Sequence, residues 1–293
     1  MGLENMNIEE LVAIDKTYLE RIRHRREIMT GQPAATLACN ESSIQAVLEL
    51  HGWMFQTYLP QRFPAMFDRH KPARTKNLVT GEEIMSEESD AITALRNLGS
   101  HVDTDFLFLL PSSTTEDGLP IYHLEAFVTC FPSGFSTRSK LGKPLAEIHK
   151  PVPGYAVKLE RSMDRYFAKI TDKVVKRANW TITTTDDLFI EAGTHLYGGD
   201  RNHESIGRQT EEIVIEDCRL RAERQTLHRL PKSKALVFAF KTYQYHLDDV
   251  KAEGDGPALA SAIEGLAAGS VPEMHFYKRG VVWGAKVARY LRE

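Results

Sequence analysis

One histidine in this sequence has neighbours that could support chemistry. His149 follows Leu145 and Ile148 at spacings of four and one residues, which puts the three side chains on one face of a short helix. A neutral imidazole in apolar surroundings suits the axial position of a haem iron. The same spacing is also typical of a structural histidine that is hydrogen-bonded to a carbonyl, and the spacing does not choose between the two.

A second group of candidate residues lies in an arginine-rich segment that is predicted to be a strand. Glu223 is a carboxylate in that segment, and Arg224 and Gln225, which follow it, can donate hydrogen bonds. Trp180 and Tyr243 lie on neighbouring predicted strands. The alternative is a structural ion-pair network with no ligand.

Three basic residues flank the histidine, and a haem would need cations to neutralise its two propionates. They are Arg138, Lys140 and Lys143. Each could equally be a solvated surface charge.

The segment around His149 contains signals for two short helical elements. Ser136 can cap a single turn that ends at Leu141, and Gly142 can adopt a positive φ after it. Pro144 suits the first position of a second short helix, and Pro151 prevents that helix from continuing. We expect this second helix to carry the histidine.

The first hundred residues have mainly helical periodicity. We predict a helix over residues 7–30, and a second helix that Asn40 caps and that stops before Pro60. A third is predicted over residues 87–98, with Gly99 immediately after its end.

After residue 104 the pattern changes to alternation, which indicates strands. Five are predicted, mostly antiparallel, with a helical insert between the second and the third, at 106–110, 122–130, 178–182, 213–215 and 236–240. The tail from 258 to 293 returns to helical spacing. This order predicts an α+β fold.

Composition excludes several classes of protein. The 293 residues are 42% hydrophobic and 26% charged, with 37 Lys and Arg against 40 Asp and Glu, so fibrous and wholly disordered chains are excluded. A formal net charge of −3 provides no field for binding nucleic acid or an anionic membrane. No apolar stretch reaches the length of a membrane span, and the N-terminus resembles no secretory or transit peptide, so we expect a cytoplasmic protein.

The sequence lacks the patterns that would let it carry electrons by itself. Its three cysteines, Cys39, Cys130 and Cys218, are far apart and form no C-x-x-C pair. The glycines at 254 and 256 follow a polar run, where a dinucleotide-binding fingerprint would need a strand.

Several long runs resemble the α subunit of haem-dependent oxidative N-demethylase and similar proteins. The resemblance covers about residues 95 to 250 and rests on the runs 130–133, 140–145, 148–154, 175–180 and 221–231. It implies a Per-ARNT-Sim (PAS) type fold that holds haem b between its antiparallel sheet and a short helix. His149 matches the proximal histidine of that helix, and the implied reaction is the oxidative N-demethylation of a small secondary amine such as dimethylamine with dioxygen.

For that reaction Glu223 could hold the ammonium group of the amine in a pocket of low dielectric constant. Arg224 and Gln225 could donate hydrogen bonds to oxygen bound at the iron, and Trp180 and Tyr243 could line the pocket.

The resemblance also implies that flavin and iron–sulfur cofactors reside on partner proteins, so that a partner reductase supplies the electrons. It gives an organisation in three parts: an N-terminal helical region (1–99), a PAS-like haem-binding core (100–250), and C-terminal helices that pack on the core (251–293). The segment 191–210 has no interpretation from its sequence. Two other classes stay open, a haem-based sensor of gas or redox state and a PAS-like ligand-binding protein that does no catalysis.

Overall fold

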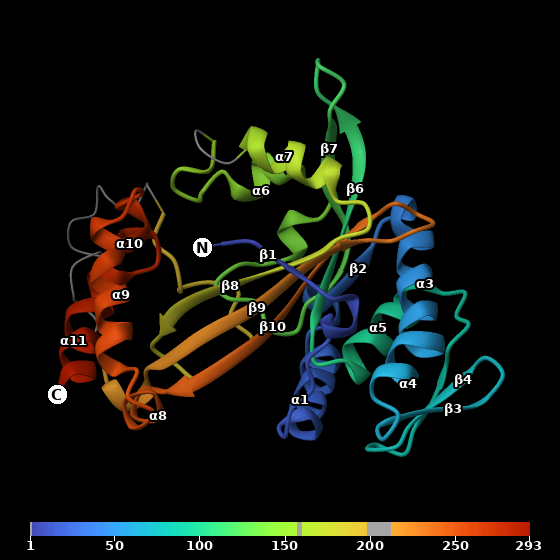
Figure 1. The fold of residues 1–293 in the computed structure, drawn as a ribbon, viewed down its shortest axis with the longest axis horizontal. Helices are drawn as coiled ribbons and strands as arrows, with labels where there is room; N and C mark the ends of the chain where they lie inside the picture. The colour runs from blue at the N-terminus through green and yellow to red at the C-terminus, as the bar shows by residue number, and fades with distance from the viewer. Residues whose placement is uncertain (1, 157–159, 198–211) are drawn as a thin grey trace.

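The computed structural model describes residues 2–156, 160–197 and 212–293, and Figure 1 shows their arrangement. The main sheet has seven strands, all antiparallel to their neighbours, in the spatial order β1-β8-β9-β10-β6-β7-β2. Their bounds are Glu4–Met6 (β1), Leu37–Cys39 (β2), Asp105–Thr114 (β6), Pro120–Val128 (β7), Val174–Thr183 (β8), Arg219–Arg229 (β9) and Leu236–His246 (β10). A separate small sheet consists of β3 (Phe67–Lys71), β4 (Arg74–Asn77) and β5 (Glu83–Met85).

The helices fall into three groups along the chain. The first group is α1 (Tyr18–Gly31), α2 (Pro33–Thr36), α3 (Ile44–Trp53), α4 (Leu59–Arg62) and α5 (Ala91–His101). The second group, between β7 and β8, is α6 (Leu145–His149) and α7 (Glu160–Lys169), preceded by a 3₁₀ turn at Arg138–Lys140. The third group follows the last strand and is α8 (Leu247–Ala252), α9 (Gly256–Ala268), α10 (Glu273–Tyr277) and α11 (Gly280–Arg292).

The strand order determines where the middle group of helices lies. The five longest strands have the spatial order β8-β9-β10-β6-β7, so the strands before and after the insert are at opposite sides of these five. The connection between β7 and β8 must therefore cross the width of the sheet. In Figure 1, α6 and α7 lie on one side of the sheet and α1 lies on the other.

Each sheet face has its own hydrophobic core. The N-terminal helices pack on one face, in a cluster that joins Ile22, Leu50 and Leu98 to Phe106 and Val237. On the other face, which we call the insert face, residues of β6, β7, β9 and β10 pack against the insert in a second cluster: Leu109, Leu124, Leu227, Leu236, Leu145, Ile148 and Phe167. The C-terminal helices cover the ends of β8 and β9 in a third cluster.

The structure confirms the α+β class and four of the five predicted strands. The predicted strand at 213–215 is wrong: Ile215–Asp217 is a 3₁₀ turn, and the fourth strand is β9, which begins at Arg219. Ile213 is buried against the C-terminal helices and its carbonyl accepts from Lys286 Nζ, so its side chain packs there without sheet pairing. Edge strands β1 and β2 and the small sheet are additional to the prediction.

The first predicted helix begins about ten residues too early, since α1 starts at Tyr18. Side chains bind the preceding backbone and replace helical hydrogen bonds. The Tyr58 hydroxyl accepts from the Val12 amide and donates to the Glu9 carbonyl, and Arg224 donates to the Glu10 and Leu11 carbonyls. Apart from a 3₁₀ turn at Ile8–Glu10, residues 7–17 form an irregular segment, which we call the N-terminal strap.

Two predicted helix ends also differ. The second helical segment continues past Pro60, because a π-helical turn at Met54–Tyr58 precedes α4 and Pro60 lies in the first turn of α4, where no amide donor is needed. Gly99 lies inside α5, which begins at Ala91 and ends at His101. A Cβ at Gly99 would be 2.7 Å from Val128 Cγ2, so glycine permits the close approach of α5 to the sheet.

A buried ion pair connects the N-terminal helices to the sheet. Arg25 Nη1 lies 2.8 Å from Asp105 Oδ1, and the two side chains are 0% and 1% exposed. Asp105 also accepts hydrogen bonds from the amides of Cys130 and Phe131 at 2.8 and 2.9 Å. Arg25 donates to the carbonyls of Gly99 and Thr104. One pair of side chains thus joins α1, α5, β6 and the start of the insert.

We predict that Asp105→Asn lowers the free energy of unfolding by about 3–5 kcal/mol, because it leaves the Arg25 charge buried without its partner. Chemical denaturation followed by circular dichroism measures the loss. The control is Glu264→Gln, which breaks an exposed pair with Arg292 and should leave the free energy of unfolding nearly unchanged. Equal losses in the two variants would contradict the prediction.

Candidate functional site

His149 is the last residue of α6, and its two ring nitrogens have different surroundings. Nδ1 lies 2.9 Å from the Leu145 carbonyl, which can only accept, so Nδ1 carries the proton and Nε2 has a free lone pair. The ring stacks on Tyr155, with centroids 4.7 Å apart. Burial lowers the pKa of His149 to about 4, so the imidazole is neutral at pH 7.

This hydrogen bond is the one expected of a structural histidine, and it is equally the arrangement that prepares a histidine to bind a metal. In metal sites, a hydrogen bond at one nitrogen fixes the orientation of the ring and directs the other nitrogen to the metal. Leu145 and Ile148 pack in the insert-face cluster, as their spacing predicted. Gly142 has a φ of +77° and supplies the predicted turn before α6.

Polar side chains of β8 and β9 form a patch on the insert face. Because side chains alternate along a strand, the pairing of Arg177 with Gln225 and of Asn179 with Glu223 puts all four on that face. Gln225 Nε2 donates to Glu223 Oε2 at 2.8 Å, and Asn179 Nδ2 approaches the same oxygen at 3.4 Å. Arg177 Nε donates to Gln225 Oε1.

Lys278 reaches this patch from the turn between α10 and α11. Its Nζ donates to Asn179 Oδ1 at 3.2 Å and to the Trp180 carbonyl. Burial lowers the pKa of Lys278 to about 8, while the charge of Glu223 opposes the shift and that of Arg177 adds to it. No sequence signal indicated Lys278, because it is about one hundred residues from Asn179 along the chain.

Lys140 is the predicted basic residue that belongs to the site. Its Nζ lies 3.8 Å from the centroid of the Phe135 ring. Its charge contributes to the lowered pKa values of both His149 and His195, which places it near both rings. Burial lowers the pKa of Lys140 to about 8, and no described carboxylate forms an ion pair with it.

His195 is a second neutral imidazole near the patch, and no pattern in the sequence indicated it. Burial, with the nearby charges of Lys278 and Lys140, lowers its pKa to about 4. Its ring contacts Tyr277, with centroids 4.5 Å apart. Residues 198–210 of the uninterpreted segment 191–210 lie outside the described residues.

Three predicted site residues belong to the opposite side of the sheet. Arg224 donates to main-chain carbonyls of the N-terminal strap. The ring of Tyr243 lies 5.1 Å from Lys241 Nζ and stacks on Tyr245. Trp180 packs against the C-terminal helices, with Lys278 Nζ 5.4 Å from its ring centroid. The side-chain alternation that brings Glu223 and Gln225 together on the insert face points Arg224, Tyr243 and Trp180 to the opposite face. These three residues are therefore not part of the candidate site.

Two predicted basic residues are at the surface. Arg138 is exposed, and Lys143 Nζ forms an exposed ion pair with Glu147 Oε1 at 2.9 Å. Of the three basic residues that flank the histidine, only Lys140 faces the patch.

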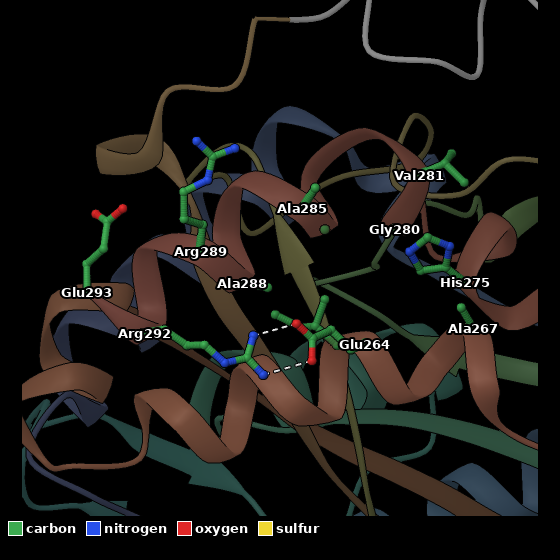
Figure 2. Close-up of a pocket in the computed structure, with 12 residues that line it drawn as sticks. Glu264, Ala267, His275, Gly280, Val281, Ala285, Ala288, Arg289, Arg292 and Glu293 are labelled. Atoms are coloured by element: carbon green, nitrogen blue, oxygen red, sulfur yellow. Dashed lines mark hydrogen bonds and ion pairs between the residues drawn. The ribbon is translucent and has the colours of Figure 1, made fainter.

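A surface pocket of about 740 Å³ lies apart from these residues, between α9 and α11. Figure 2 shows Arg292 and Glu264 paired beside it and small side chains such as Ala285 and Ala288 along its wall. None of the predicted site residues lines it.

The insert face fits a haem on three counts. His149 has a free Nε2, the buried Tyr155 hydroxyl has no hydrogen-bond partner among the described residues, and Lys140 and Arg177 are cations whose pKa values burial lowers. Propionate groups would compensate those charges. Within the described ranges, no cluster of three or more His, Cys, Asp or Glu side chains could hold a metal ion. The described helices include none with both the length and the apolar character to cross a membrane.

Fold and site together define an α+β protein with a neutral imidazole and uncompensated cations over one face of an antiparallel sheet. The chain belongs to the family described as haem-dependent oxidative N-demethylase, alpha subunit-like, whose model matches residues 2–288. The match extends beyond the stretch 95–250 that carries the sequence resemblance, and includes the N-terminal helices and nearly all of the C-terminal ones.

We predict that Lys140→Met raises the melting temperature of the haem-free chain at pH 7, because it removes a desolvated charge and keeps a side chain that packs on Phe135. The folded-state pKa of Lys140, about 8, is below its ordinary value of 10.5. The destabilisation is therefore complete below about pH 8, and the gain from the substitution should shrink between about pH 8 and 10.5.

Differential scanning calorimetry at pH 7 and pH 10 tests this. Lys143→Met is the matched control. Because the charge of Lys143 is exposed and paired, this substitution should leave the melting temperature nearly unchanged. A lower melting temperature for Lys140→Met at pH 7 would refute the prediction.

Proposed function

We propose that this chain is a haem-dependent oxidoreductase that removes a methyl group from a small secondary amine. The observation that carries the proposal is the pair of environments at His149: a proton held on Nδ1 by the Leu145 carbonyl and a free Nε2 on a neutral ring. The family description supports haem dependence and oxidative N-demethylation at the level of the family. The amine, the dioxygen and the electron donor are part of the proposal.

Haem b would be held by His149 through Nε2, with its propionates near Lys140 and Arg177. The buried Tyr155 ring supports the imidazole by stacking. Its hydroxyl forms no hydrogen bond with any described group. The strand order supports a PAS-like assignment: five antiparallel strands with the first and last paired at the centre, and a helical crossing between the second and third.

Glu223 and Gln225 would bind the amine beside the cofactor. A carboxylate in this half-enclosed patch attracts the ammonium form of the substrate, and the hydrogen bond from Gln225 Nε2 fixes the carboxylate. Glu223 could also accept the proton that the ammonium must lose before the nitrogen reacts.

The overall reaction determines what must reach this chain. The amine, dioxygen, two electrons and two protons yield the demethylated amine, formaldehyde and water. Bound haem supplies the activation of dioxygen and the removal of electrons from the amine. The three cysteines are dispersed and the sequence contains no dinucleotide fingerprint, so a partner reductase with flavin or iron–sulfur cofactors would deliver the electrons.

We expect His149→Ala to lose most of its haem and to keep its far-ultraviolet circular dichroism, because the change removes a metal ligand at the end of a short helix and leaves the sheet intact. The intensity of the Soret band per protein gives the haem content, and added imidazole should restore part of it. His123→Ala is the control: both ring nitrogens of His123 are within 2.9–3.1 Å of Ser113 and the Gly142 carbonyl, so the haem content should not change. Full retention of haem with an unchanged Soret band in His149→Ala would place the ligand elsewhere.

A second prediction concerns the electrons. The haem-loaded chain should release little formaldehyde from dimethylamine with NAD(P)H alone, and should release it once a flavin or iron–sulfur reductase, or an artificial one-electron donor, is added. Formaldehyde is measured by a colorimetric assay, with the haem-free chain as control. Robust release with NAD(P)H and no second protein would rule out dependence on a partner.

A further inference from the structure

The charged groups of the patch do not balance. Lys140, Arg177 and Lys278 are cations at the patch, and Glu223 is the carboxylate beside them. Arg221, two residues before Glu223 on β9, is a further buried cation on this face, and its guanidinium donates to the carbonyls of Phe131, Pro132 and Leu188. Burial lowers the pKa values of all four cations, while the charge of Glu223 raises those of Arg177, Arg221 and Lys278. A patch with this composition favours ligands that bring negative charge.

Glu223 and Lys278 are close to each other and not in contact. The side-chain amide of Asn179 stands between them, with Nδ2 3.4 Å from Glu223 Oε2 and Oδ1 accepting from Lys278 Nζ at 3.2 Å. One amide group therefore holds an anion and a cation at a fixed separation on the same face.

Both charged groups keep unused capacity for hydrogen bonds. Glu223 receives its two described hydrogen bonds on Oε2, which leaves Oε1 available. An ammonium group has three donors, and Lys278 uses two of them, on Asn179 Oδ1 and on the Trp180 carbonyl. The pair can thus receive one cationic group and one anionic group from the same ligand.

The charge balance selects the ligand, and this step rests on the proposed function. If the two propionates of a haem pair with Lys140 and Arg177, and Arg221 stays bound to the carbonyls of Phe131 and Pro132, Glu223 and Lys278 are the charged groups left to bind a substrate. A dialkylammonium ion would neutralise Glu223 and leave Lys278 desolvated beside a second cation. A ligand with both a secondary ammonium and a carboxylate pairs with both groups.

We propose that the substrate is an N-methylated amino acid, whose ammonium group binds Glu223 and whose carboxylate binds Lys278. Asn179 is the positioning residue that sets the distance between the two. This makes Lys278, from the C-terminal helices, the residue that determines specificity for the carboxylate.

The test is isothermal titration calorimetry on the full-length chain as purified, with sarcosine, dimethylamine and acetate as probes. Sarcosine should bind at least about tenfold more tightly than dimethylamine or acetate, since one charge-assisted hydrogen bond of about 1.5 kcal/mol corresponds to that factor. Lys278→Met should reduce the affinity for sarcosine about tenfold and leave the affinity for dimethylamine unchanged or higher. Glu223→Gln should weaken the binding of both amines.

Lys286→Met is the matched control. Lys286 lies in α11 and also donates to a main-chain carbonyl, that of Ile213. The Lys286→Met variant should bind sarcosine like the wild type. If Lys278→Met does not fold, the comparison of probes on the wild-type chain still decides the question. Dimethylamine binding as tightly as sarcosine, or no binding of sarcosine, would overturn the inference.

Haem content separates this inference from the proposed function. A chain that loads haem through His149 and shows no preference for sarcosine overturns the inference alone. A chain that cannot be loaded with haem overturns the proposed function, whether or not it prefers sarcosine.

Discussion

The ion pair between Arg25 and Asp105 is the interaction on which the arrangement of the sheet and its two covers depends. Both side chains are fully enclosed, and hydrogen bonds from Arg25 and to Asp105 add to the Coulomb attraction between them in offsetting the desolvation penalty. Asp105 accepts from the two amides that follow β7, and Arg25 donates to two carbonyls at the end of α5 and the start of β6. The N-terminal helices and the beginning of the crossing connection are thus held by the same carboxylate.

The strand order determines that this connection carries the candidate site. The first and last of the long strands pair at the centre of the sheet, so the chain must cross one whole face to pass from β7 to β8. The crossing brings α6 and the preceding turn, with Lys140 and His149, over the polar positions of β8 and β9. The opposite face is closed by the N-terminal helices, which leaves the insert face as the one where the sheet presents charged side chains to a ligand.

Local patterns in the sequence predicted the parts of this site that depend on neighbours in the chain. The positive φ at Gly142, the short helix after Pro144, and the apolar face shared by Leu145, Ile148 and His149 are all set within a few residues. The grouping of Glu223 with Arg224 and Gln225 failed for an equally local reason, since consecutive residues of a strand point to opposite faces. His195 and Lys278 had no local signal, because tertiary packing of a loop and of the C-terminal helices brings them to the patch.

The same charges that make this face suited to a ligand weaken the chain without one. Burial lowers the pKa values of Lys140 and Lys278 to about 8, so each lysine remains mainly charged at pH 7 while its surroundings favour the neutral form. A fold selected only for stability would have a carboxylate or an apolar side chain at these positions. On the face that the N-terminal helices cover, by contrast, the cations have carboxylate partners: Asp103 pairs with Arg21 and Lys241, and Lys241 also pairs with Asp15. One face of the sheet thus carries paired charges and the other carries more cations than carboxylates, and it is on this second face that a bound anionic group would add stability.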